Sequence, residues 1–278
     1  MERTDKRFNK TANRGEVKPM KLLKIFLFIF ILAFPITTAI GQTKITVDYD
    51  FYEGYPDVNP STNSSLLKIN DSDSVFEIYN KSTKDSTSTY FTDDGTQHLV
   101  RYPKSDENST VIKNYKKDSL LTLDLGYHPN KFFYIAEKMS LFDWEMKDGE
   151  KEILNYKCNK ATTTFRGRNY TAWFAAEIPV SDGPWKFTGL PGLILEVEDD
   201  MGNVKISAYK IILNDDSIKK LTHKKNPKYP TLTWEEYAAG VKRDYDNFIK
   251  AMYSTVSGTA TLELQWKIER MEFLFKNY

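Results

Sequence analysis

The stretch that decides the fold reads EILNYKCNKATTTFRGRNYTAWF and covers residues 152–174. It contains three short runs rich in β-branched and aromatic residues, namely Glu152–Cys158, Ala161–Phe165 and Tyr170–Phe174. Between the last two runs, Arg166-Gly167-Arg168-Asn169 supplies the glycine that a tight hairpin turn needs. The stretch therefore predicts successive antiparallel strands.

Strand patterns continue on both sides of this stretch. Lys44–Phe51 alternates, which places Ile45, Val47, Tyr49 and Phe51 on one face. A second hairpin is predicted where Leu193–Val197 and Val204–Leu213 flank the acidic turn Asp199–Asn203. Further short strands are predicted at Leu66–Ile69, Val75–Tyr79, Leu99–Tyr102, Thr110–Tyr115, Leu120–Leu125, Phe132–Ala136 and Phe142–Met146, with loops at Tyr55–Ser65 and Lys81–Asp94.

One segment has the period of a helix. Thr233-Trp234-Glu235-Glu236 matches the capping box, in which the first and fourth residues bond each other's backbone amides. Behind it, apolar residues recur at helical spacing at Trp234, Tyr237, Ala238, Val241, Tyr245, Phe248, Ile249 and Met252. We predict a mainly β fold, α+β overall: an antiparallel curved sheet or half-barrel with a packed C-terminal amphipathic helix.

The first 41 residues predict an export signal. Basic residues precede the apolar run Ile25–Phe34, and Ala39 and Gly41 present small side chains where a signal peptidase cuts. We expect cleavage near Gly41, a single β-rich domain over 42–278, and a periplasmic or secreted protein with no transmembrane span. An uncleaved anchor is the alternative, and Met20 is an alternative start.

The composition excludes several classes of protein. The chain carries 39 basic and 38 acidic residues, so it lacks the basic excess of a general nucleic-acid binder. Cys158 is the single cysteine, which excludes an intramolecular disulfide and a cysteine-rich zinc site. Aromatic residues make up 14% of the chain, enough for a substantial core. The sequence predicts no cofactor and no metal.

Residues 189–194 read Gly-Leu-Pro-Gly-Leu-Ile, and with their surroundings they resemble the GLPGLI family of exported bacterial proteins of Bacteroidetes type. Phe174-Ala175-Ala176 departs from the family, which carries Tyr and a polar residue there. The resemblance implies export and a strand-rich fold, and it implies no catalytic residue. Further matches lie at Tyr156-Lys157-Cys158, Ala161-Thr162, Ala172-Trp173, Ile178-Pro179, Gly183-Pro184 and Phe187.

The signature Gly189, Leu190, Pro191, Gly192, Leu193, Ile194 also has a local structural meaning. Leu-Pro-Gly favours a type II turn, which places Gly192 at positive φ. As a structural latch, the turn would bury Leu190 and Leu193 and set the register of the strand that follows. The alternative is an exposed recognition loop.

Aromatic and basic residues around the signature suggest a binding site. Trp173, Trp185 and Phe187 could line a pocket for an apolar ligand, and Arg166 and Arg168 could clamp an anion or a partner carboxylate. We therefore predict an exported cell-envelope protein, without evident catalytic machinery, that binds an apolar ligand, a lipid or a partner polypeptide.

Two alternatives stay open at this point. The first is a hydrolase that uses Cys158 as nucleophile or an acidic cluster as acid and base. Glu196, Glu198, Asp199 and Asp200 form that cluster, and their spacing matches no calcium-binding loop. The second is a structural accessory of an outer-membrane transport system. Ser residues are plentiful, but the sequence holds no Gly-x-Ser-x-Gly nucleophile elbow.

Overall fold

The computed structural model describes residues 43–54, 61–79, 86–91, 97–102, 108–125, 132–221, 225–255, 269–270 and 273–274. All of them belong to one compact unit, Gln42–Tyr278. The predicted export signal lies outside the described residues. In the part of the chain that is described, no helix is long and apolar enough to cross a membrane.

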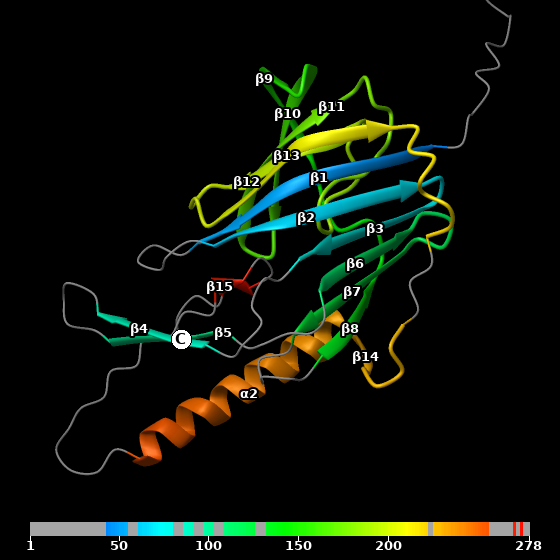
Figure 1. The fold of residues 1–278 in the computed structure, drawn as a ribbon. Coiled ribbons are helices and arrows are strands. Elements are labelled where there is room, and N and C mark those ends of the chain that lie inside the picture. Colours follow the sequence, from blue (N-terminus) through cyan, green and yellow to red (C-terminus); the bar gives the residue numbers. More distant parts are fainter. Residues whose placement is uncertain are drawn as a thin grey trace, which may run out of the picture. The chain divides into compact units, whose positions relative to one another are not determined.

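A sheet of twelve strands forms the molecule's framework (Figure 1). Its order is β14-β8-β7-β6-β3-β2-β1-β13-β12-β11-β10-β9, and every neighbouring pair is antiparallel except β14 and β8. The sheet is open, because β14 and β9 are its two edges and are not paired with each other. The predicted fold class, a mainly β protein with an open antiparallel sheet, is confirmed.

The strands of this sheet have the following bounds. They are β1 (Lys44–Glu53), β2 (Ser61–Asn70), β3 (Asp73–Ile78), β6 (Ser109–Asn114), β7 (Ser119–Leu125), β8 (Phe132–Glu137), β9 (Glu145–Ile153), β10 (Tyr156–Phe165), β11 (Arg168–Ala175), β12 (Leu193–Asp199), β13 (Val204–Leu213) and β14 (Thr231–Thr233). Two small pairs accompany the sheet, β4 (Ser86–Phe91) with β5 (Gln97–Tyr102) and β15 (Glu269–Arg270) with β16 (Phe273–Leu274).

Several sequence-based boundaries were wrong. Of the predicted strand Phe142–Met146, only Glu145 and Met146 lie in a strand, at the start of β9. β2 begins at Ser61, inside the predicted loop Tyr55–Ser65, and β4 lies inside the predicted loop Lys81–Asp94. Glu152–Cys158 is not one strand, because Leu154 and Asn155 form the turn between β9 and β10 with φ angles of 52° and 64°. For β2 and β4, backbone pairing with β1 and β5 outweighed the local side-chain pattern.

The sheet curls around one face, which we call the inner face. Val47, Tyr49 and Phe51 of β1 are buried on it. Arg166, in the β10–β11 turn, forms an ion pair with Glu137 at the end of β8. Eight strands separate β8 from β10 in the sheet order, so the two ends of the sheet meet only because it curls.

Helix α2 (Trp234–Thr255) follows β14 directly. The predicted capping box is formed: Thr233 N donates to Glu236 Oε2 at 2.8 Å, and Glu236 N donates to Thr233 Oγ1 at 3.2 Å. Tyr237 and Val241 of the helix pack in a small apolar cluster with Ile135 of β8. The predicted packing of an amphipathic C-terminal helix on the sheet is thus confirmed.

Candidate functional site

The connection between β11 and β12, residues 176–192, does not loop out into solvent. It lies in the main apolar core, where its apolar side chains join those of the inner face. Trp185 and Phe187 are 5% and 0% exposed, and the ring of Phe187 packs 5.0 Å from that of Tyr170 on β11. Tyr49 of β1 donates to the carbonyl oxygen of Ile194 at 2.7 Å. The chain itself therefore fills the inner face of the curled sheet.

A buried ion pair fastens this connection to the sheet. Lys113 Nζ, on β6, donates to Asp182 Oδ1 at 2.6 Å, and both side chains are fully buried. The same ammonium group donates to the carbonyl oxygens of Gly183 at 2.8 Å and Phe187 at 3.2 Å. Burial lowers the pKa of Lys113, and the carboxylate of Asp182 opposes that shift. The three acceptors occupy the three protons of the ammonium group.

The signature residues sit at the end of the connection. Leu190 and Leu193 are 1% and 0% exposed, which agrees with a structural latch. The predicted positive φ at Gly192 was wrong, because the left-handed residue is Gly189, with φ of 100°. Gly192 is needed for a different reason: a Cβ atom there would overlap the backbone carbonyl of Ala175. Close approach of two backbone segments, not turn geometry, fixes this glycine.

The five residues predicted to bind a ligand are not brought together. Trp185 and Phe187 meet in the core, with their ring centroids 5.2 Å apart. Arg166 contacts Glu137 and stacks on the ring of Trp234, whereas Arg168 is buried in an ion pair with Asp199. Trp173 alternates with buried Ala172 and Phe174 on β11 and so lies on the opposite face, 4.5 Å from Lys151 Nζ.

The residues of the hydrolase alternative are also engaged in structure. Cys158 is fully buried, its thiol donates to the carbonyl oxygen of Tyr156 at 3.5 Å, and burial raises its pKa to about 11. A thiol with such a pKa is protonated at neutral pH and is a poor nucleophile. This environment weighs against Cys158 as a catalytic group.

The acidic cluster builds the turn between β12 and β13. Asp199 Oδ1 accepts from the backbone amides of Asn203 at 2.7 Å and Val204 at 3.0 Å. Asp200 accepts from Asn169, and Glu196 pairs with Lys151 at 2.5 Å. Among the described residues, no group of three or more His, Cys, Asp or Glu side chains is arranged to hold a metal ion.

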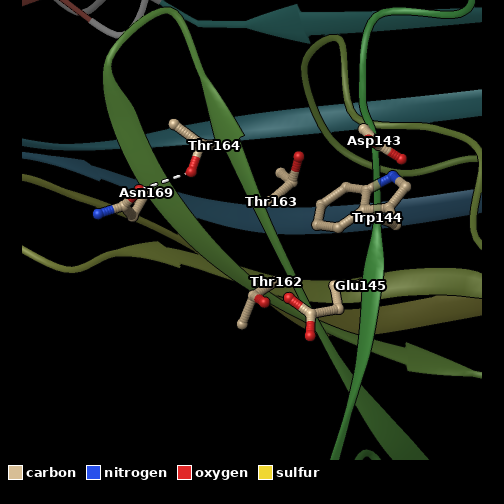
Figure 2. Close-up of a pocket in the computed structure, with 7 residues that line it drawn as sticks. All are labelled: Asp143, Trp144, Glu145, Thr162, Thr163, Thr164 and Asn169. Carbon is tan, nitrogen blue, oxygen red and sulfur yellow. Dashed lines mark hydrogen bonds between the residues drawn. The ribbon is translucent and has the colours of Figure 1, made fainter.

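A hollow of about 620 Å³ opens where β9 begins (Figure 2). Pairing between β9 and β10 ends at Glu145 and Thr162, whereas β10 continues to Phe165. The hollow occupies the space beside this overhang of β10. Its lining consists of Asp143, Trp144, Glu145, Thr162, Thr163, Thr164 and Asn169.

Polar groups dominate the lining of the hollow. Thr163 is 6% exposed, and its hydroxyl has no hydrogen-bond partner among the described residues. In Figure 2 Thr163 lies between Thr164 and Trp144, with its hydroxyl turned away from Thr162. Trp144 Nε1 donates to the carbonyl oxygen of Thr188 at 2.8 Å, so the indole presents its ring and not its N–H to the hollow.

Sequence reasoning missed both Lys113 and the hollow. Lys113 lies on the same face of β6 as Val111 and Ser109, a mixed face on which a lysine gives only a weak signal. Asp143-Trp144-Glu145, an aromatic between two acids, was a weaker one. Thr163 gave no signal, because its lack of a partner appears only once β9 and β10 are paired.

Comparison with known proteins gives one family match. A family model described as "Protein of unknown function (Porph_ging)" matches residues 164–196, the region from the end of β10 through the signature to β12. No curated protein matches the sequence.

Among solved structures, the chain is similar to PNGF-II in two crystal forms, P21 and C2. The identities are 15% and 16%, and the TM-scores are 0.49 and 0.47. Each alignment covers 73% of this chain and 34% or 33% of PNGF-II, so the chain spans about a third of the length of those structures.

Proposed function

We propose that this is an exported protein of the cell envelope that binds a partner polypeptide and carries out no chemistry of its own. One observation carries the choice of a polypeptide over a lipid or another apolar ligand. The inner face of the curled sheet, where a half-barrel would hold a lipid, is filled by residues 176–192. A fully buried ion pair holds that filling in place.

Export rests on the predicted signal over residues 1–41 and on the resemblance to the GLPGLI family. The absence of catalysis is supported by the surroundings of the candidate groups. Cys158 is buried with a raised pKa, and Asp199 is bonded by Arg168 and two backbone amides. Groups with these partners serve the fold, since their charges or protons are already engaged.

The open edge at β9 supports a polypeptide partner. β9 is an edge strand of nine residues, the first six of which are exposed. An extended segment can add to such an edge through backbone hydrogen bonds. Charged side chains and the irregular register opposite Asn159 and Lys160 disfavour indiscriminate pairing at this edge.

The test is to express the full-length chain in its own envelope and purify it after chemical cross-linking. We expect a mature chain that begins at Gln42, no stoichiometric lipid in the extract, and a cross-linked polypeptide that binds again when both proteins are purified. Stoichiometric lipid in the mass spectrum would contradict the proposal. A product that retains Ile25–Phe34 would indicate an anchored protein instead.

A further inference from the structure

Two Asp–Gly pairs lie among the described residues, and the fold places them in opposite surroundings. The carboxyl group of an aspartate can close onto the backbone nitrogen of a following glycine, because glycine has no side chain to block the approach. Asp148–Gly149 lies in β9 and is exposed, whereas Asp182–Gly183 lies in the connection and is buried. One molecule therefore contains both a candidate site for this reaction and its control.

Asp148 and Gly149 lie outside the backbone pairing that holds the rest of β9. β9 pairs with β10 up to Lys147 and again from Glu150. The two residues between them are matched with no residue of β10. β9 is also the edge of the sheet, and no described strand lies on its other side (Figure 1). The pair can therefore move locally without breaking a described cross-strand pair, and such motion requires little free energy.

The backbone of β9 requires the glycine at this position. Gly149 has φ of 137°, a conformation that residues with a side chain rarely adopt. A Cβ atom added there would meet Lys160 and Trp173 at 3.5 Å, which is ordinary contact. Backbone conformation, and not lack of space, therefore keeps a nitrogen without a shielding side chain directly after Asp148.

Asp182–Gly183 is held by the core. Asp182 is fully buried, and its Oδ1 accepts from Lys113 Nζ at 2.6 Å and from the amide of Gly183 at 2.7 Å. A Cβ atom added to Gly183 would lie 2.6 Å from that of Ile194, so the space around the pair is filled. The carboxyl carbon of Asp182 cannot turn toward the Gly183 nitrogen without breaking these contacts, which requires unfolding of the core.

We propose that Asp148–Gly149 is a site of spontaneous isoaspartate formation, which changes the β9 edge that is offered to the partner polypeptide. The Gly149 nitrogen forms a bond to Cγ of Asp148, and the amide proton leaves with the hydroxyl of the protonated carboxyl group as water. A second water molecule then opens the succinimide ring at the backbone carbonyl carbon of Asp148. One water leaves and one enters, so the atoms balance.

The product has the same mass as the original protein but a longer backbone. The chain now runs through Cβ and Cγ of residue 148, which adds one methylene group to the backbone of β9. The former backbone carbonyl carbon becomes a free carboxylate. An added backbone atom displaces the hydrogen-bonding groups that follow it, so it disrupts addition of a strand along this edge. This consequence rests on the proposed function, whereas the modification itself does not.

The test incubates the folded full chain at neutral pH and measures isoaspartate at each pair by electron-transfer fragmentation, which distinguishes the two isomers at equal mass. At Asp148 we expect a rate within about tenfold of the rate in concentrated urea, because an exposed and unpaired edge opens easily. At Asp182 the folded chain should react at least about a thousandfold more slowly than the chain in urea, because the reaction requires global unfolding.

Asp148→Glu is the matched control variant. It keeps an exposed carboxylate, but closure onto the next nitrogen would need a six-membered ring in place of a five-membered one. After incubation, the wild type should lose affinity for the purified partner polypeptide, whereas Asp148→Glu should keep it. Each chain is compared with its own fresh preparation.

Three outcomes would contradict parts of this account. No isoaspartate at Asp148, or equal yields at Asp148 and Asp182 in the folded chain, would overturn the modification site. Isoaspartate at Asp148 with unchanged affinity for the partner would overturn its effect on the β9 edge. If the fresh chain recovers no polypeptide partner, the proposed function fails, and the fragmentation data still decide the modification.

Discussion

Trp144 joins two regions that are built in opposite ways. Its indole N–H bonds the connection of residues 176–192, where Lys113 donates to Asp182 Oδ1 and to the carbonyl oxygens of Gly183 and Phe187 in the core. Its ring lines the hollow at the start of β9, where two carboxylates are exposed and the hydroxyl of Thr163 has no described partner. In the first region the chain buries its own side chains, whereas the second region exposes carboxylates to solvent.

The two regions also differ in how clearly the sequence marks them. The signature Gly189–Ile194 gives the sequence its resemblance to a family, yet its Leu190, Leu193 and Ile194 side chains are buried in the core. The hollow lies beside a polar strand end that no motif marks. The recognisable sequence motif therefore marks a packed part of the core. The hollow is formed by residues that come together only when the strands pair. Four substitutions test this difference between the connection and the hollow.

The largest loss in the free energy of unfolding is expected from Lys113→Met. The substitution leaves Asp182 as a buried carboxylate without its cation, which costs about 3–5 kcal/mol. Lys151→Met is the control, because its ion pair with Glu196 is partly exposed and such pairs contribute about 0–1 kcal/mol. Urea unfolding measures both. Similar small losses in the two variants would show that the connection is not locked by Lys113.

The second-largest loss in the free energy of unfolding is expected from Gly192→Ala. The added Cβ would overlap the carbonyl of Ala175, and overpacking of this kind costs about 3 kcal/mol. Gly202→Ala is the control that separates the cost of a steric clash from the cost of a strained φ angle. Gly202 has φ of 71°, but the space around it is open. The Gly202→Ala variant should lose about 1 kcal/mol of unfolding free energy. A larger loss at Gly202 than at Gly192 in thermal unfolding would contradict the close-approach account.

Cys158→Ala should cost about 1–2 kcal/mol at neutral pH as a small cavity. Its pH dependence follows from the raised pKa, from a reference value of 9.0 to about 11 in the folded protein. Between these values the folded state keeps a proton that the unfolded state releases, so the thiol's contribution is complete below pH 9 and falls as pH rises toward 11. The stability gap between wild type and Cys158→Ala should narrow across that window. A gap that widens would contradict the burial of the thiol.

The smallest effect on stability is expected from Asp143→Asn. Asp143 is exposed, and surface substitutions change the free energy of unfolding by less than about 0.5 kcal/mol. A loss of more than about 0.5 kcal/mol in urea unfolding would contradict the exposure of Asp143 and make the rim of the hollow part of the fold's support.

Much of the fold could be predicted from the sequence because the sheet has one buried face. The alternation of Val47, Tyr49 and Phe51 predicted β1, and the capping box at Thr233 fixed the start of α2 to the residue. Ser61–Ser65 was not readable as strand because it joins β1 through backbone pairing and offers no apolar alternation. β9 is an exposed edge strand, so its mostly charged side chains do not show the apolar–polar alternation that predicts a strand.

The candidate site was less readable than the fold. Burial of the signature leucines followed from the turn chemistry, but the reason for Gly192 depends on the position of Ala175 in three dimensions. Lys113 and Asp182 lie far apart in the sequence, and only the curl of the sheet brings them together. Thr163 looks like any strand threonine until β9 stops one residue short of it.

The most direct test of the central claim is native-state hydrogen exchange of the connection. The amides of Phe187, Leu193 and Ile194 donate to the carbonyls of Pro184, Ile178 and Asp182 at 3.1, 3.0 and 2.9 Å. If the connection is part of the core, these amides exchange only through global unfolding, with the same opening free energy as those of β1. Exchange through a separate, low-energy opening would contradict the account and make the signature a mobile surface element.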